Sequence, residues 1–121
     1  LPEENIIAEP PAPANSVTIE LTDRKKQKMF TTTIENGGYK IFGRVTDKEN
    51  GIVGLNGDSY ISKKQFMLSW RAPQLVIEDM GSLNGTYLND ERVRGKVNVR
   101  NGVIRIGNVA GEREFEIRIR K

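Results

Sequence analysis

Short runs in which apolar and polar residues alternate restrict the fold of this chain more than any other feature. Every second residue is apolar in Val17–Leu21, and the same alternation returns in Phe115–Ile119. A repeat of two places successive side chains on opposite faces of a strand, so each run predicts a β-strand with one buried face. No stretch shows the helical period with capping residues. The pattern predicts an all-β protein.

Further runs of β-branched and aromatic residues lie between these two strands, separated by turn signals such as Asn36-Gly37-Gly38 and Asn101-Gly102. They recur about every eight to twelve residues, which is typical of a β-sandwich or barrel. Phe66 and Trp70 share a face with Leu68, so we expect all three in the core. The runs are Phe30–Ile34, Tyr39–Phe42, Phe66–Trp70, Leu75–Ile77, Thr86–Leu88, Val97–Val99 and Val103–Ile106.

The length of 121 residues fits one domain. Four of the five prolines fall within the first thirteen residues. Such a segment buries too little apolar surface to offset the entropy of ordering it. We therefore predict a flexible Pro-rich linker at residues 1–16 and a single domain at residues 17–121.

Cysteine and histidine are both absent from the chain. Disulfides, thiolate metal sites and the commonest general base in enzymes are therefore excluded. No nucleophile elbow or Gly-rich phosphate loop is present either. These absences favour a protein that is not an enzyme and that uses no metal or cofactor. The lack of cysteine is compatible with a reducing compartment, and we expect a cytoplasmic location.

The net charge of +3 is unevenly distributed along the chain. Residues 1–16 contain three glutamates and no basic residue, so the remaining 13 acidic and 19 basic residues give the domain a net charge of +6. A basic domain favours an anionic partner, such as nucleic acid, acidic lipid or a phosphoprotein, although the same charge can serve solubility alone. No apolar run is long enough to span a bilayer, so we expect no membrane-spanning segment.

Three polar segments and one Ile-Gly pair lie among the ends of the predicted strands, where a sandwich usually carries its functional groups. Each is ordinary by itself. Arg44 alone is typical of a solvated surface charge, and Asn84-Gly85-Thr86 also fits a glycosylation sequon or a hairpin turn. The segments are Gly43-Arg44, Ser62-Lys63-Lys64-Gln65, Ser82-Leu83-Asn84-Gly85-Thr86 with Asn89, and Ile106-Gly107.

In this order, the four segments resemble the signature of the forkhead-associated domain, and the resemblance covers about residues 17–121. That signature has Gly-Arg after the third strand, then Ser-Arg-x-His, then Ser-x-Asn-Gly-Thr with a later Asn, and finally Ile-Gly. The resemblance implies a β-sandwich of about eleven mostly antiparallel strands with binding loops at one end. It also implies a phosphothreonine-dependent protein–protein interaction module in signalling or regulation.

The resemblance assigns contacts with the phosphopeptide to five residues. Arg44 would clamp the phosphate, because a guanidinium offers a planar fork of donors that stays charged. Ser62 would add a short hydroxyl donor, and Lys63 a second cation. Asn84 can donate and accept, which suits the backbone of the ligand. Leu83 would lie beside the phosphothreonine, where it either lines the groove or packs inside its own loop.

Five other motif residues are expected to shape the binding loops. Gly43 would form the turn beside Arg44, and Gly85 a turn with positive φ. The Thr86 hydroxyl would cap the loop that Asn89 pins. Gln65 stands where the family carries a histidine that braces the loops. Its amide also supplies a donor and an acceptor, but ordering its extra rotamers costs roughly 1 kcal/mol.

Two other interpretations stay open. One is a basic β-barrel that binds nucleic acid through Tyr60, Phe66, Trp70 and Tyr87. The other is a degenerate family member that serves only as an assembly domain. The preferred interpretation expects a monomeric domain whose partner is a protein or peptide phosphorylated on threonine by a Ser/Thr kinase, with no nucleic acid and no membrane. Residues 46–58 are then expected to read the residues that flank the phosphothreonine.

Overall fold

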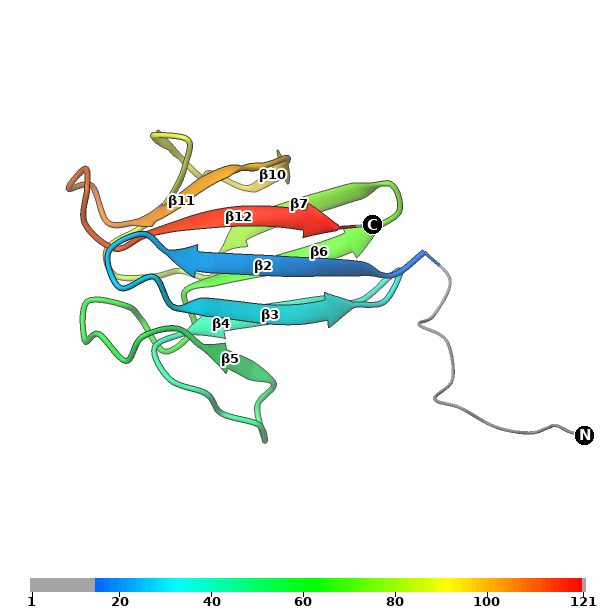
Figure 1. The fold of residues 1–121 in the computed structure, drawn as a ribbon, viewed down its shortest axis with the longest axis horizontal. Helices are drawn as coiled ribbons and strands as arrows, with labels where there is room; N and C mark the ends of the chain where they lie inside the picture. The colour runs from blue at the N-terminus through cyan, green and yellow to red at the C-terminus, as the bar shows by residue number, and fades with distance from the viewer. Residues whose placement is uncertain (1–14, 121) are drawn as a thin grey trace, which may run out of the picture.

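The computed structural model describes residues 15–120, which form eleven β-strands and no helix (Figure 1). Within this part of the chain no helix could span a membrane. The strands are β2 (Val17–Asp23), β3 (Met29–Ile34), β4 (Tyr39–Gly43), β5 (Ile52–Gly54), β6 (Phe66–Arg71), β7 (Gln74–Asp79), β8 (Thr86–Leu88), β9 (Glu91–Arg92), β10 (Lys96–Val99), β11 (Gly102–Ile106) and β12 (Glu114–Arg120).

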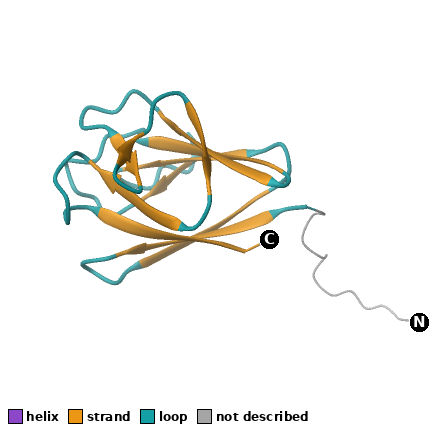
Figure 2. Ribbon diagram, turned by 90° about the horizontal axis from the view of Figure 1, so that it is seen from above, coloured by secondary structure: helices purple, strands orange, loops and turns teal. Residues whose placement is uncertain are grey.

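The strands form two sheets that pack face to face, and Figure 2 shows the two layers from above. One sheet has the order β10-β7-β6-β4-β5 and the other β3-β2-β12-β11-β8-β9. Every pair of neighbouring strands is antiparallel except β4 and β5, which are parallel. The predicted all-β sandwich of mostly antiparallel strands is confirmed.

The core lies between the sheets and is built from the alternating residues of the sequence. In β2 the side chains of Val17, Ile19 and Leu21 are buried, while the residues between them are half-buried. In β12, Phe115 and Ile117 are fully buried opposite them. Burial of a large apolar side chain stabilises a fold by about 1.5–3 kcal/mol, so this alternation fixes which face of each strand points inward.

Two strands were not predicted from the sequence. β5 lies inside the segment interpreted as a flanking-residue loop, and its three residues pair with the end of β4. β9 has only two residues, Glu91 and Arg92, and both are exposed. Neither is long or apolar enough to show the period of two, so tertiary pairing with a neighbouring strand defines each one.

The predicted linker falls mostly on residues 1–14, which lie outside the described part of the chain, so that boundary stays a prediction. Of the linker residues that are described, Asn15 accepts a hydrogen bond from the indole nitrogen of Trp70 through its backbone carbonyl. Strand β2 then begins at Val17, the residue at which the domain was predicted to start.

The loops that carry most of the motif residues gather at one end of the sandwich, on the left in Figure 1. They are the segments 55–65, 80–85 and 107–113, and the β2–β3 turn lies at the same end. The described chain enters β2 and leaves β12 at the opposite end, where Thr18 pairs with Arg120.

Asp23 is a buried carboxylate at the loop end of β2. Its Oδ1 accepts hydrogen bonds from the Lys25 and Lys26 amides at 2.9 and 3.1 Å, and its Oδ2 accepts one from Asn56 Nδ2 at 2.9 Å. Burial alone would raise the pKa of Asp23, but these hydrogen bonds outweigh it and hold the pKa below its ordinary value. The ionised form therefore stabilises the fold.

A lowered pKa implies stability that is present above the unfolded pKa, about 3.9, and lost as pH falls through the folded pKa. We expect Asp23→Asn to lower the melting temperature at pH 7, because its amide cannot accept all of these bonds. The difference from wild type should shrink between about pH 5 and pH 3, as measured by thermal melts. Glu116→Gln, at an exposed residue of β12, is the control. A difference that is constant with pH would contradict this account.

Candidate functional site

Arg44 directly follows β4 and is half-buried. Its backbone amide donates to the Ser62 carbonyl at 3.0 Å, and its side-chain Nε donates to the Ile61 carbonyl at 2.8 Å. The second bond fixes the direction of the guanidinium. No residue among 15–120 accepts a hydrogen bond from the two terminal nitrogens, so they remain available to an anion.

Ser62 and Lys63 lie on the segment that the backbone and side chain of Arg44 bind, through the carbonyls of Ser62 and Ile61. The Ser62 hydroxyl oxygen accepts the Leu83 amide at 3.0 Å, which joins two loops, and its hydrogen has no acceptor within the described residues. Lys63 is exposed and has no ion pair within the same range. Three kinds of donor therefore meet at this end of the sandwich: a guanidinium, a hydroxyl and an ammonium.

Leu83 projects from its loop with 88% of its surface exposed. Of the two expectations for this residue, packing inside the loop is therefore wrong. A leucine side chain that is almost fully exposed on a loop held by the Ser62 hydroxyl remains free to contact a ligand.

Gln65 is completely buried and joins the two loops that carry the site. Its Oε1 accepts the Ser62 amide at 2.9 Å. Its Nε2 donates to the Gly85 carbonyl and to the Thr86 hydroxyl, both at 3.0 Å. The glutamine amide therefore makes the kind of brace that was expected of the family's histidine. Close packing in the surrounding core restricts the Gln65 side chain to one rotamer, so its extra rotamers do not loosen the loops.

Asp79, the last residue of β7, holds the loop from the other side; it begins the sequence segment that contains Ser82–Thr86, but no role was predicted for it. Its Oδ1 accepts the hydroxyls of Ser82 and Thr86 at 2.6 and 2.7 Å, and its Oδ2 accepts the Ser82 amide at 3.0 Å. The Ser82 hydroxyl oxygen in turn accepts the Gly85 amide at 3.0 Å. An Asp three residues before a Ser is a known turn signal and could have identified this cap.

Asn84 is held by the neighbouring loop. Its Nδ2 donates to the Tyr60 carbonyl at 2.8 Å, which orients the amide while Oδ1 has no donor among the described residues. The Ile106-Gly107 motif explains how the Tyr60 ring packs beside this loop. Gly107 has φ +84°, and a Cβ there would lie 2.3 Å from the Tyr60 ring, so only glycine allows this packing.

Gly43 does not form a turn, which corrects the expectation from the sequence. It is the last residue of β4, and a Cβ at this position would lie 1.7 Å from the Lys63 carbonyl oxygen. The glycine is required because the two backbones approach closely. Gly85, in contrast, has φ +84°, the left-handed conformation expected of it.

Asn89 pins a different loop from the one expected. The side-chain Oδ1 of Asn89 accepts a hydrogen bond from the Val103 backbone amide, and the backbone amide of Asn89 donates one to the Val103 carbonyl, both at 2.9 Å. These bonds hold the β8–β9 turn against β11, and none reaches the loop of Asn84. The expectation relied on closeness in sequence, whereas strand β8 separates the two loops.

The aromatic residues proposed for nucleic acid do not form an exposed platform. Phe66 and Trp70 are buried, as their shared parity predicted. Arg113 covers the ring of Tyr60, and Arg105 that of Tyr87, at 4.0 and 4.5 Å from the ring centroids. Stacking on bases needs several rings exposed on one surface, so the structure gives this alternative no support.

Comparison with known proteins identifies the class. The family profile described as FHA domain matches residues 40–107, more than half of the chain. The FHA domain-containing protein FhaB of Mycobacterium tuberculosis is 43% identical over 56 residues, which are 46% of this chain and 36% of FhaB. The chain therefore aligns with only about a third of that relative's length.

Solved FHA domains show the same fold. The FhaA FHA domain, complexed with the intracellular domain of Rv3910, has a TM-score of 0.59 and 27% identity, covering 86% of this chain and 99% of that domain. An FHA domain from a study of phosphothreonine-dependent FHA interactions has a TM-score of 0.60 and 27% identity. The match covers 88% of this chain and 96% of that domain. The chain belongs to the FHA domain family, whose members are interaction modules.

The brace made by Gln65 generates a stability prediction. Gln65→Leu keeps the side-chain volume but leaves the Ser62 amide without its acceptor and takes one of two donors from the Gly85 carbonyl, which keeps the Gly107 amide. We expect a loss of roughly 2–4 kcal/mol in the free energy of unfolding, measured by urea titration. Gln65→His should retain most of the stability, because an imidazole also donates and accepts.

Gln74→Leu makes the same chemical change at an exposed residue of β7 and serves as the matched control. If Gln65→Leu were as stable as Gln74→Leu, the three hydrogen bonds of Gln65 would not hold the loops together.

Proposed function

We propose that this domain binds proteins or peptides phosphorylated on threonine and so links two proteins when a kinase has modified one of them. The observation that carries the proposal is the pair of free donor groups on Arg44 and Ser62, which lie on two segments joined by hydrogen bonds from Arg44 to the Ser62 and Ile61 carbonyls. A phosphate monoester brings a charge of about −1.5 to −2 and three acceptor oxygens to such donors.

The geometry favours one mode of phosphate binding. Because Nε of Arg44 is bonded to Ile61, the phosphate would meet the guanidinium end-on, through its two terminal nitrogens. The Ser62 hydroxyl would donate a further bond, and Lys63 would add charge without a fixed direction. The site recognises the shape and charge of a phosphate with one oriented fork and one short donor.

The peptide backbone would be bound by Asn84. Its Oδ1 and its second amide hydrogen have no partner among the described residues, so the amide can accept from and donate to an extended chain. Leu83 would line the groove beside the phosphothreonine. Two relatives support the proposed kind of partner, though not the individual residues: one FHA domain was solved with a protein partner, and another was studied for phosphothreonine-dependent interactions.

We further propose that the partner is the product of a Ser/Thr kinase, that the isolated domain is monomeric and that it acts in a cytoplasmic signalling or regulatory pathway. None of these steps requires catalysis by the domain, because binding alone brings the phosphorylated partner to whatever is attached to it.

Substitution of Arg44 is the central test. Arg44→Ala should abolish measurable binding of a phosphothreonine peptide in calorimetry, because the phosphate loses its only fork. Arg44→Lys should restore binding only in part, since an ammonium lacks the planar geometry. Circular dichroism should show both variants folded.

Arg100→Ala removes an exposed cation at the opposite end and is the matched control, which should bind as wild type does. A folded Arg44→Ala variant that binds as tightly as wild type would refute the phosphate clamp. If Arg44→Ala and Arg100→Ala lowered the affinity equally, and the affinity fell steeply with salt, the result would instead indicate nucleic-acid binding.

The pH dependence gives a second test. The second pKa of a phosphate monoester is about 6, and the chain has no histidine. The pKa of Asp47, near Lys63, is held below its ordinary value mainly by hydrogen bonds from Asn50, so this carboxyl does not titrate near pH 6. Binding should therefore weaken as pH falls from 7.5 to 5.0, with a midpoint near 6 that reports the ligand. A flat profile over this range would show that the dianion is not recognised.

A further inference from the structure

The orientation of Asn84 depends on Tyr60. The only hydrogen bond that the described residues make with the Asn84 amide runs from its Nδ2 to the Tyr60 carbonyl, at 2.8 Å. Tyr60 lies on the segment between β5 and β6, which has no strand partner of its own. Whatever holds Tyr60 in place therefore also sets the direction in which Asn84 presents its free oxygen.

Tyr60 is held from its backbone and from its ring by one small cluster. The Asp58 Oδ1 accepts the Tyr60 amide at 2.8 Å, and the Asp58 Oδ2 accepts Nε of Arg113 at 2.7 Å. The Arg113 guanidinium then covers the Tyr60 ring, 4.0 Å from its centroid. The Gly107 backbone also packs against the ring, so closely that a Cβ there would collide with it. Two loops that are 55 residues apart in the chain are joined here by an ion pair and a cation–π contact.

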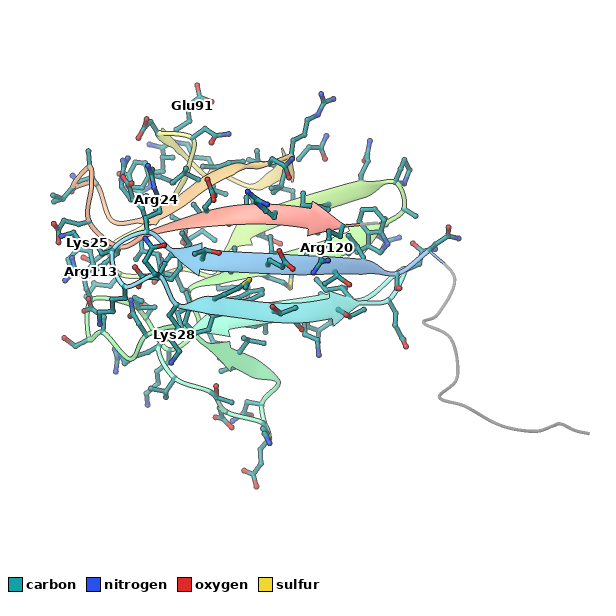
Figure 3. The ribbon with its side chains drawn as sticks, in the orientation of Figure 1. Arg24, Lys25, Lys28, Glu91, Arg113 and Arg120 are labelled. Atoms are coloured by element: carbon teal, nitrogen blue, oxygen red, sulfur yellow. The ribbon has the colours of Figure 1, made fainter. Side chains whose placement is uncertain are left out.

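Arg113 reaches this position at a conformational cost. Its φ is +46°, in the left-handed region that a residue with a Cβ adopts only under strain. Such a conformation persists only where surrounding contacts impose it. Figure 3 shows Arg113 at the loop end of the sandwich, beside Arg24 and Lys25 of the β2–β3 turn. Those two cations pair with Glu114 and Glu112, the residues on either side of Arg113, but both cations are more than half exposed, so their ion pairs contribute little to holding the turn.

The charge of Asp58 is secured by the same contacts. Burial alone would raise its pKa, but the hydrogen bonds from the Tyr60 amide and the Arg113 guanidinium outweigh burial and keep the pKa below its ordinary value. The ion pair is therefore intact throughout the neutral range.

We infer that Arg113 is a positioning residue for phosphopeptide binding: it fixes Tyr60, and through the Tyr60 carbonyl it fixes the amide of Asn84. This inference rests on the proposed function and deepens it. Arg113 need not touch the peptide. Its contribution is to remove freedom from Asn84 before the ligand arrives, so that less ordering has to occur on binding. None of the four motifs contains Arg113.

A double-mutant cycle on phosphothreonine-peptide affinity tests the coupling, with calorimetry of wild type, Arg113→Ala, Asn84→Ala and the double variant. Arg113→Ala should weaken binding about 3- to 10-fold, the loss expected for ordering one side chain. In the Asn84→Ala background it should cause no further loss, because the positioned group is gone. An equal loss in both backgrounds, or no loss in either, would overturn the inference.

Arg24→Ala is the matched control, since it removes an ion pair with Glu114 on the same turn but does not contact Tyr60. It should bind as wild type does. If Arg113→Ala does not fold, Asp58→Asn replaces it in the cycle, because it keeps the acceptor for the Tyr60 amide and removes the ion pair. Non-additivity with Asn84→Ala supports the inference, and additivity refutes it.

A readout without ligand separates this inference from the proposed function. The Asn84 side-chain amide signal in a nitrogen–proton correlation spectrum should shift and broaden in Arg113→Ala and remain unchanged in Arg24→Ala. An unchanged signal in both variants would refute the coupling even if the phosphopeptide binds. If the wild-type domain bound phosphorylated and unphosphorylated peptides with equal affinity, the proposed function would be refuted, and with it a role of Arg113 in phosphopeptide binding.

Discussion

The buried amide of Gln65 is the interaction on which the candidate site depends. A sandwich fixes its strands by apolar packing, but loops at its end have no core of their own and need polar contacts to hold a shape. Three hydrogen bonds from one side chain connect the loop of Ser62 with that of Gly85 and Thr86. Because the amide is sealed from water, breaking these bonds leaves unpaired groups, so the two loops behave as one body.

Around this brace the charged groups divide into two sets. The carboxylates of Asp23, Asp58 and Asp79 all accept hydrogen bonds from residues in or next to loops: from backbone amides in each case, and also from a side-chain amide, a guanidinium and two hydroxyls respectively. Among residues 15–120 the cations Arg44 and Lys63 form no ion pair, although Asp47 lies near enough to Lys63 for its charge to be felt. The acids thus shape the loop end of the sandwich, while its unpaired positive charge faces outward, which is the arrangement that an anionic ligand requires.

The sequence could predict the sandwich because alternation of two residues directly encodes which face of a strand is buried. It could not predict β5 and β9, whose pairing is imposed by neighbours. The motif residues could be located, but their contacts could not: Gly43 is needed for a close backbone approach, and Asn89 binds a different loop. The contact of Arg113 with Asp58 joins distant loops, and no local pattern in the chain encodes it.

The pairing of Thr18 with Arg120 means that the described chain enters and leaves the sandwich at adjacent points, on the side away from Arg44. The two ends of the described domain are therefore neighbours in space. Such a unit can be placed in the middle of a longer protein without separating the sequences on either side, because little distance has to be bridged. In such an arrangement the loop end of the domain would face away from the flanking sequences, and a ligand bound there would be separated from them by the length of the sandwich.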